Sequence, residues 1–166
     1  MTVVGLALTA VKAAQAGNGY SFLSTHGSDA NPCTFAAPCR SFAAAMAATN
    51  PNGGIMILDV GGYGSLTIDK GINIVNASGG EAGISFTGTG IGVTVTAGVN
   101  DAVNLRGLTI DGVGLGTVGI EFNSGKSLTL EDCVIRRVAN DGINFDPNGS
   151  SSLSIYNSVK NLCHRV

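Results

Sequence analysis

Tryptophan is absent from the chain, aromatic residues make up only 5% of it, and charged residues only 12%. With so few large side chains, a wide spherical core cannot be filled. The chain instead has 44% hydrophobic residues and 25 glycines in 166 residues, which suits a narrow core with tight corners. There is no run of Lys or Arg, and the net charge is −2, so the electrostatic signature of nucleic-acid binding is missing. We therefore expect one domain and no nucleic-acid partner.

The C-terminal half of the chain repeats itself. A shift of 25 residues superimposes two sets of positions: Leu105, Leu130 and Ile155, and also Val113, Val138 and Cys163. The same shift places Asp132 and Asn157 over Gly107. Residues 119–122 and 142–145, Gly-Ile-x-Phe in both cases, match at a spacing of 23. A period in the low twenties, built from short β segments and turn residues, indicates a solenoid.

Short β-type runs follow one another from Ile55 onward, each ended by Gly, Asn or Asp. The connections are too short for crossover helices, which excludes a doubly wound α/β sheet. Similar side chains recurring at one period indicate parallel, in-register strands about 4.8 Å apart. Lys160 takes the place of Ile110 and Ile135 and suggests a bulge or the end of the regular part. We expect an all-β fold, a right-handed parallel β-helix with three strands per coil and about four to five coils.

The N-terminal third divides into two expected segments. Residues 1–16 carry an apolar run and end in Ala-Gln-Ala, as in a secretory signal, although no positive residue precedes the run. A small apolar cap helix or a misassigned start is the alternative. Residues 17–54 form the expected cap, with an alanine-rich helix at 41–48 that Asn50-Pro51-Asn52-Gly53-Gly54 would stop. The β-helix is then expected over residues 55–166.

The cysteines suggest an oxidising compartment. Cys33 and Cys39 lie in a short loop with two prolines, which favours a disulfide over half of a metal site. Cys133 falls in the series Leu108, Cys133, Ser158 and is expected to be a buried small hydrophobe rather than a nucleophile.

Three motifs carry a family resemblance. They are Gly-Ser-Asp-Ala-Asn-Pro-Cys (27–33), Pro-Cys-Arg-Ser-Phe (38–42) and Gly-Tyr-Gly (62–64). Together they resemble the N-terminal module of exported bacterial right-handed β-helix proteins of the pectate-lyase-like superfamily. The resemblance implies a capping helix, then a strand and a turn that open the first coil. It also implies secretion, or a periplasmic or cell-surface location, and a polysaccharide ligand, often an acidic one.

The catalytic motifs of that superfamily do not carry over. The Gly-His-Gly and Asn-Thr-Asp of polygalacturonase-like hydrolases are missing. A pectate-lyase-like site would use Arg136 or Arg137 as base, with Asp111, Glu131 and Asp132 binding the substrate and Ca²⁺. The competing interpretation is an ion-pair ladder on the outer face, because neighbouring strands often pair opposite charges. We expect no resident cofactor or metal, and Ca²⁺ only if the protein is a lyase.

Three functions follow from these observations. The first is a non-catalytic exported binding or structural module, with extracellular polysaccharide as its partner. The second is a small polysaccharide lyase or glycoside hydrolase acting on acidic glycans. The third is a scaffold that self-associates into a homo-oligomer through an uncapped C-terminal coil. None of them places the mature protein in a membrane, since the apolar run near the N-terminus is too short to span one.

Overall fold

The computed structural model describes residues 17–161. The expected signal-like segment 1–16 and Cys163 therefore lie outside the described residues. Within them the chain forms one short helix, α1 (Phe42–Ala48), and thirteen strands. The strands are β1 (Asn18–Leu23), β2 (Thr49–Ile57), β3 (Gly61–Gly62), β4 (Leu66–Ile68), β5 (Ile72–Asn76), β6 (Ala82–Ser85), β7 (Ile91–Thr96), β8 (Ala102–Arg106), β9 (Thr109–Ser124), β10 (Ser127–Glu131), β11 (Val134–Phe145), β12 (Ser152–Tyr156) and β13 (Val159–Asn161).

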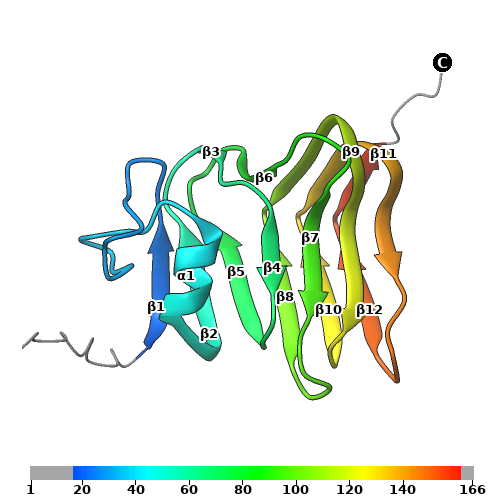
Figure 1. The fold of residues 1–166 in the computed structure, drawn as a ribbon, viewed down its shortest axis with the longest axis horizontal. Coiled ribbons are helices and arrows are strands. Elements are labelled where there is room, and N and C mark those ends of the chain that lie inside the picture. The colour runs from blue at the N-terminus through cyan, green and yellow to red at the C-terminus, as the bar shows by residue number, and fades with distance from the viewer. Residues whose placement is uncertain (1–16, 162–166) are drawn as a thin grey trace, which may run out of the picture.

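The strands build two sheets, and the named strands pair in parallel throughout. The first sheet has the order β1-β2-β5-β8-β10-β12. The second has the order β13-β11-β9-β6-β3, with β7 pairing both β4 and β9. Figure 1 shows the strands following one another along the long axis, from β1 to β12. The expected all-β, parallel character is confirmed.

The 25-residue repeat is confirmed in the register of the first sheet. Leu130 of β10 pairs with Leu105 of β8 on one side and with Ile155 of β12 on the other. The residue that ends each repeat segment has a left-handed backbone, with φ of 69° at Gly107, 54° at Asp132 and 45° at Asn157. Gly and Asn tolerate this conformation best, and Asp adopts it more readily than most other residues. The Asn157 side-chain amide donates to the Asp132 carboxylate at 2.7 Å, so equivalent corners also bond to each other.

One expected superposition is wrong. Val138 pairs with Gly116, whereas Val113 is exposed and has a φ of 51°. The backbone turns aside after Asp111, and the register between β9 and β11 shifts at that point. Gly116 is needed where pairing resumes, because a Cβ there would lie 2.2 Å from the Phe86 ring. A local bulge therefore changes the spacing from 25 to the 22 residues that separate Gly116 from Val138.

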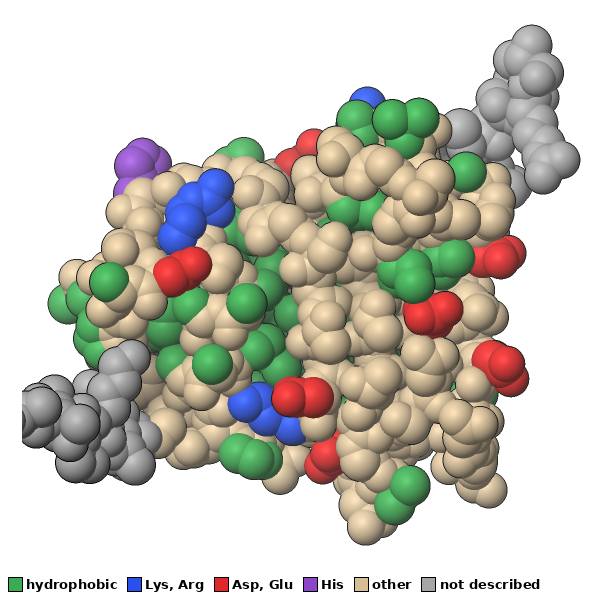
Figure 2. All heavy atoms as spheres, in the orientation of Figure 1, with side chains coloured by type: hydrophobic (Ala, Val, Ile, Leu, Met, Phe, Trp, Pro, Cys, Tyr) green, Lys and Arg blue, Asp and Glu red, His purple; other side chains and the backbone are tan. Residues whose placement is uncertain are grey.

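The core is a narrow column of aliphatic side chains with few aromatic rings. Phe122 is buried and stacks on Phe145, with ring centroids 4.7 Å apart and planes 17° apart. The phenylalanines of the two Gly-Ile-x-Phe segments therefore stack on each other. Cys133 is also buried, as expected, and burial raises the pKa of its thiol, so the reactive thiolate is disfavoured. Figure 2 shows that charged side chains are scattered singly or in small groups over the visible face.

Helix α1 covers the N-terminal end of the column. Ser41 is its N-cap, and the Ser41 hydroxyl accepts from the Ala44 N–H at 3.2 Å. The expected helix is confirmed. The residues expected to end it with a turn, 50–54, are instead part of a strand. Strand β2 starts at Thr49 and includes residues 50–54, with a register shift against β1. The expected boundary at 54/55 thus falls inside a strand.

The predicted disulfide between Cys33 and Cys39 is present. It closes a loop that continues the first sheet beyond β1: the Phe22 N–H donates to the Cys33 carbonyl, and the Cys39 N–H donates to the Phe22 carbonyl. Both half-cystines are buried against the column. Within residues 17–161, no helix has the length and apolar character needed to cross a membrane.

Candidate functional site

The five residues expected to form a site fall into two separate groups. Asp111, Arg136 and Arg137 come together at the corner where β9 and β11 turn aside. Glu131 and Asp132 lie elsewhere, at the end of β10, where both approach Arg106 at 3.6 and 3.8 Å. The side chains of that second group are exposed, and their partner is Arg106 rather than either arginine of the ion-pair ladder considered from the sequence.

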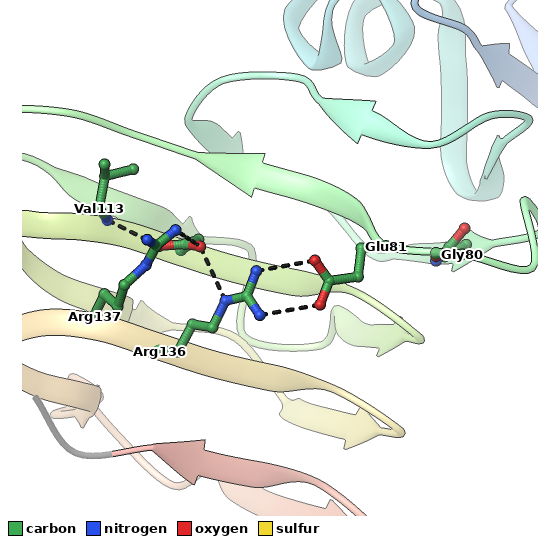
Figure 3. A network of polar contacts seen from close by, with 7 residues as sticks. Gly80, Glu81, Val113, Arg136 and Arg137 are labelled. Atoms are coloured by element: carbon green, nitrogen blue, oxygen red, sulfur yellow. Dashed lines mark hydrogen bonds and ion pairs between the residues drawn. The ribbon is translucent and has the colours of Figure 1, made fainter.

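The first group gains a partner that the sequence did not suggest. The Arg136 guanidinium donates to both carboxylate oxygens of Glu81 at 3.0 Å and, through Nε, to Asp111 at 2.9 Å. Arg137 donates to Asp111 through Nε at 2.8 Å and also through Nη2. Figure 3 shows Arg136 lying between Glu81 and the neighbouring carboxylate, with Arg137 reaching that carboxylate from the other side. Glu81 is 55 residues away from Arg136 in sequence, beyond any pattern of the 25-residue repeat.

The bulge in β9 and β11 makes this arrangement possible. Consecutive residues of a regular strand point to opposite faces, so Arg136 and Arg137 would normally diverge. The φ of 53° at Arg137 and of 51° at Val113 breaks that alternation in both strands. The Val113 N–H then donates to Asp111 Oδ1 at 2.9 Å, which fixes the carboxylate between the two guanidinium groups.

Asp111 is the electrostatic centre of the group and is only 4% exposed. The hydrogen bond from Arg137 lowers the pKa of the Asp111 carboxyl to about 2. Burial opposes the shift, and donation from Val113 and Arg136 adds to it. The pKa of the Arg136 guanidinium is raised by its hydrogen bonds to Glu81 and Asp111, and that of Arg137 by Asp111. A general base must first be deprotonated in order to accept a proton. Because the carboxylates stabilise the protonated guanidinium groups, this pairing disfavours the expected role of both arginines as a base.

A shallow groove of about 220 Å³ lies beside the network. Its lining comes from consecutive strands of the second sheet and the segments leading into them: Val60, Gly61, Gly62, Glu81, Ala82, Gly83, Ser85, Thr109, Asp111 and Arg136. The groove therefore crosses the strands and follows the direction in which they stack. Three glycines leave much of its surface without side chains, while Glu81 and Arg136 supply charged groups.

A second polar cluster, centred on Asp59, was missed in the sequence. The Asp59 carboxylate accepts from the Ser24 hydroxyl at 2.7 Å, from the Thr25 N–H at 2.9 Å and from the Tyr63 hydroxyl. Burial raises the pKa of Asp59, but these hydrogen bonds outweigh it and hold that pKa well below its usual range. Tyr63 belongs to the Gly-Tyr-Gly motif, so the motif's tyrosine holds the carboxylate of Asp59, and Asp59 joins the chain after β2 to the chain after β1.

Serine, histidine and aspartate meet in this cluster, but not as a nucleophilic triad. His26 Nδ1 lies 3.2 Å from Asp59 Oδ2, and the Ser24 hydroxyl donates to the same oxygen. A triad needs the imidazole between the hydroxyl and the carboxylate, so that it can take the serine proton. Here the carboxylate stands between them, and the arrangement organises a turn.

The described part of the chain holds no group of three or more His, Cys, Asp or Glu side chains arranged to bind a metal ion. Asp111, Glu131 and Asp132 in particular do not converge, since Asp111 binds two arginines and the other two face Arg106. Their expected role as substrate ligands stays a prediction.

Comparison of the chain with protein-family models, with curated proteins and with solved structures finds no match in any of the three. The resemblance to the pectate-lyase-like superfamily therefore rests on the motifs around Cys33, Cys39 and Tyr63 alone.

Proposed function

We propose that the protein is an exported right-handed parallel β-helix that binds polysaccharide without cleaving it. The β-helix assignment is supported by the way one repeat supplies three pairing segments. These are β8, residues 109–111 of β9 and residues 118–124 of β9, each paired in parallel with equivalent segments before and after it. The disulfide in the N-terminal cap fits export to an oxidising compartment.

The observation that carries the binding proposal is the groove bordered by Glu81 and Arg136. It crosses successive strands, so a linear polymer laid along it would meet a new strand about every 4.8 Å. The glycine-rich surface lets a sugar ring approach the backbone closely. The exposed edge of the carboxylate–guanidinium pair offers both hydrogen-bond acceptors and donors to adjacent hydroxyl groups.

Charge balance in the network suggests which polysaccharides bind. Two carboxylates, Glu81 and Asp111, oppose two guanidinium groups, Arg136 and Arg137, so the network carries no net charge. A polyanion would gain no net Coulomb attraction there, whereas hydroxyl recognition does not depend on it. We therefore expect neutral or weakly charged polysaccharides to bind, with little dependence on salt.

The two arginines are held in the form that cannot act as a base. Each is held by carboxylates that stabilise its protonated form, and abstraction of a sugar proton would require the deprotonated form. A lyase would need a further rearrangement that frees one arginine from Asp111.

The test measures binding to a panel of neutral and acidic polysaccharides, with Ca²⁺ and with chelator, beside an absorbance assay for unsaturated uronate products. Arg136→Ala and Glu81→Ala are expected to weaken binding about tenfold or more, which is about 1.4 kcal/mol each. Arg106→Ala and Glu131→Ala are the matched controls, since they remove the same side-chain types from the exposed pair at the end of β10.

Three outcomes would overturn the proposal. Equal loss of binding in the control variants, or no binding to any polysaccharide, would remove the groove as the site. Formation of unsaturated products by the wild-type protein would show a lyase, and loss of that product in Arg136→Ala or Arg137→Ala would assign the base.

A further inference from the structure

The Glu81 side chain occupies one edge of the Arg136 guanidinium group beside the groove. Arg136 Nη1 and Nη2 each donate to a different carboxylate oxygen of Glu81 at 3.0 Å, so the two groups meet as a bidentate pair (Figure 3). This planar, two-bond geometry is the one in which arginine recognises carboxylates generally. The nitrogens that would bind the carboxylate of a ligand are therefore already bound to a carboxylate of the chain itself.

The two carboxylates around Arg136 differ in how firmly they are held. Asp111 is buried and is fixed by Arg137 and by the Val113 N–H as well as by Arg136. The Glu81 side chain is 66% exposed, and among the described residues its carboxylate has Arg136 as its only partner. An exposed pair of this kind contributes little to stability. Glu81 can therefore leave the guanidinium group while Asp111 keeps that group in place.

The charge of Glu81 decides the charge of the whole network. With Glu81 in place, two carboxylates balance the two guanidinium groups. Without it, Asp111 alone would oppose Arg136 and Arg137, and one positive charge would be left over. The other residues that line the groove are uncharged, so none of them would compensate. The Arg136 edge would then attract a carboxylate ligand and offer it two parallel hydrogen bonds.

We propose that Glu81 is the specificity-determining residue of the groove. Its carboxylate takes the place that the carboxylate of a uronate would occupy on Arg136, so the groove admits uncharged sugars and rejects uronates. The inference rests on the proposed function, because it names the residue by which that same groove selects its ligand. A uronate must either displace Glu81 from Arg136 or lie beside it as a like charge, and both lower its affinity. An uncharged sugar meets neither penalty.

The test compares two monosaccharides, D-glucuronate and D-glucose, which differ in that one carries a carboxylate where the other carries a hydroxymethyl group. Each is titrated into the full chain at low salt, and binding is followed by NMR through the arginine Nε–H signals. In Glu81→Ala, glucuronate should bind about tenfold or more tightly than in the wild type, and added salt should weaken that binding. Glucose should show no such gain, because it has no charge for the released guanidinium group to attract.

Two control variants separate the proposed role of Glu81 from a simple change in net charge. Glu131→Ala removes an exposed glutamate from Arg106 and changes the net charge by the same amount. Arg106 faces two exposed carboxylates and no buried one, so glucuronate binding should stay at the wild-type level in this variant. The double variant Glu81→Ala/Arg136→Lys keeps the positive charge but lacks the planar guanidinium group, and it should lose most of the gain.

The inference is overturned if Glu81→Ala gains no affinity for glucuronate, if Glu131→Ala gains as much, or if the double variant keeps the full gain. Glu81→Gln preserves the length of the side chain and provides a second measurement should Glu81→Ala fold poorly; it should also bind glucuronate more tightly than the wild type. Binding of neutral polysaccharide to the wild type is measured separately. If the wild type binds none, the proposed function fails, whereas the glucuronate titrations still decide whether Glu81 masks Arg136.

Discussion

Two aspartates, Asp59 and Asp111, each hold together segments that are distant in sequence. Asp59 joins Ser24 and Thr25 to Tyr63, and Asp111 joins the bulge of β9 to both arginines of β11. In both cases, several donors converge on one carboxylate, which stabilises its charged form. Their removal should therefore affect stability in a way that depends on pH.

For Asp111, the sign follows from its lowered pKa. The pKa of about 2 in the folded protein lies below the usual aspartate pKa of 3.8, so the stabilisation is present above about pH 4 and is lost as the pH falls toward 2. Because the Arg137 partner is more than half exposed, solvent screening limits the contribution to about 1–2 kcal/mol. We expect Asp111→Asn to be destabilised by this amount at pH 7 and to differ little from wild type near pH 2.

The measurement is urea denaturation of wild type and variant at pH 7, 4 and 2. Asp141→Asn, an exposed residue of the same strand β11, controls for the loss of one negative charge. A gap between Asp111→Asn and wild type that stays constant from pH 7 to pH 2 would contradict this electrostatic explanation.

Among the elements, α1 and the disulfide loop depend on the column that they cover. A helix of seven residues is too short to persist alone in water, and α1 survives because Phe42, Ala45 and Met46 are buried. The loop between Cys33 and Cys39 is held by backbone hydrogen bonds to β1 as well as by the disulfide. The cap is therefore stabilised partly by packing and partly by a covalent bond.

Replacing both cysteines should show how much the covalent bond contributes. The half-cystines are six positions apart, and the chain-entropy relation for such a short loop gives about 2 kcal/mol. We expect the free energy of unfolding of Cys33→Ser/Cys39→Ser to fall by that amount, so that the double variant unfolds at a lower urea concentration. Reductant should move the wild type toward the double variant and leave the variant unchanged, whereas equal stability of the two proteins without reductant would contradict the prediction.

At the scale of the whole molecule, parallel pairing requires the backbones of neighbouring repeats to approach each other closely. Strands β9 and β11 share the longest pairing, and Gly119 of β9 faces Gly142 of β11 so closely that a Cβ on Gly119 would lie 2.5 Å from the Gly142 carbonyl oxygen. Strand β9 cannot retreat alone, because its segment around Gly119 also pairs with β7 on the other side. Strand β13 pairs only with residues 134–136 of β11 and leaves Gly142 paired to β9 alone in the described chain. A methyl group at this place must separate two repeats.

Gly119→Ala is therefore expected to destabilise the protein by about 1–3 kcal/mol, the usual cost of overpacking. The control is Gly19→Ala in β1, where a Cβ would meet nothing within 4 Å and the change should stay within about 0.5 kcal/mol. Urea midpoints compare the two variants. Equal midpoints would mean that the repeats tolerate a wider spacing.

Much of the fold was predictable because it repeats locally. The ladder through Leu105, Leu130 and Ile155, the stacked pair Phe122 and Phe145, and the left-handed corners at Gly107, Asp132 and Asn157 all follow from spacing. The prediction failed at Val113, since a bulge shifts register without changing the pattern of residue types. Within the candidate site, the pairing of Asp111 with Arg136 was predicted, but the separation of Glu131 and Asp132 from it was not.

The sequence by itself determined the period, the parallel register and the Cys33–Cys39 pairing, because each depends on residues close together or at a fixed spacing. Only the tertiary structure decided which charges meet. Arg136 binds Glu81 across 55 residues, and Asp59 binds Ser24 across 35 residues. Such contacts arise where the chain leaves its repeat, and their partners depend on how bulges and corners are placed in space.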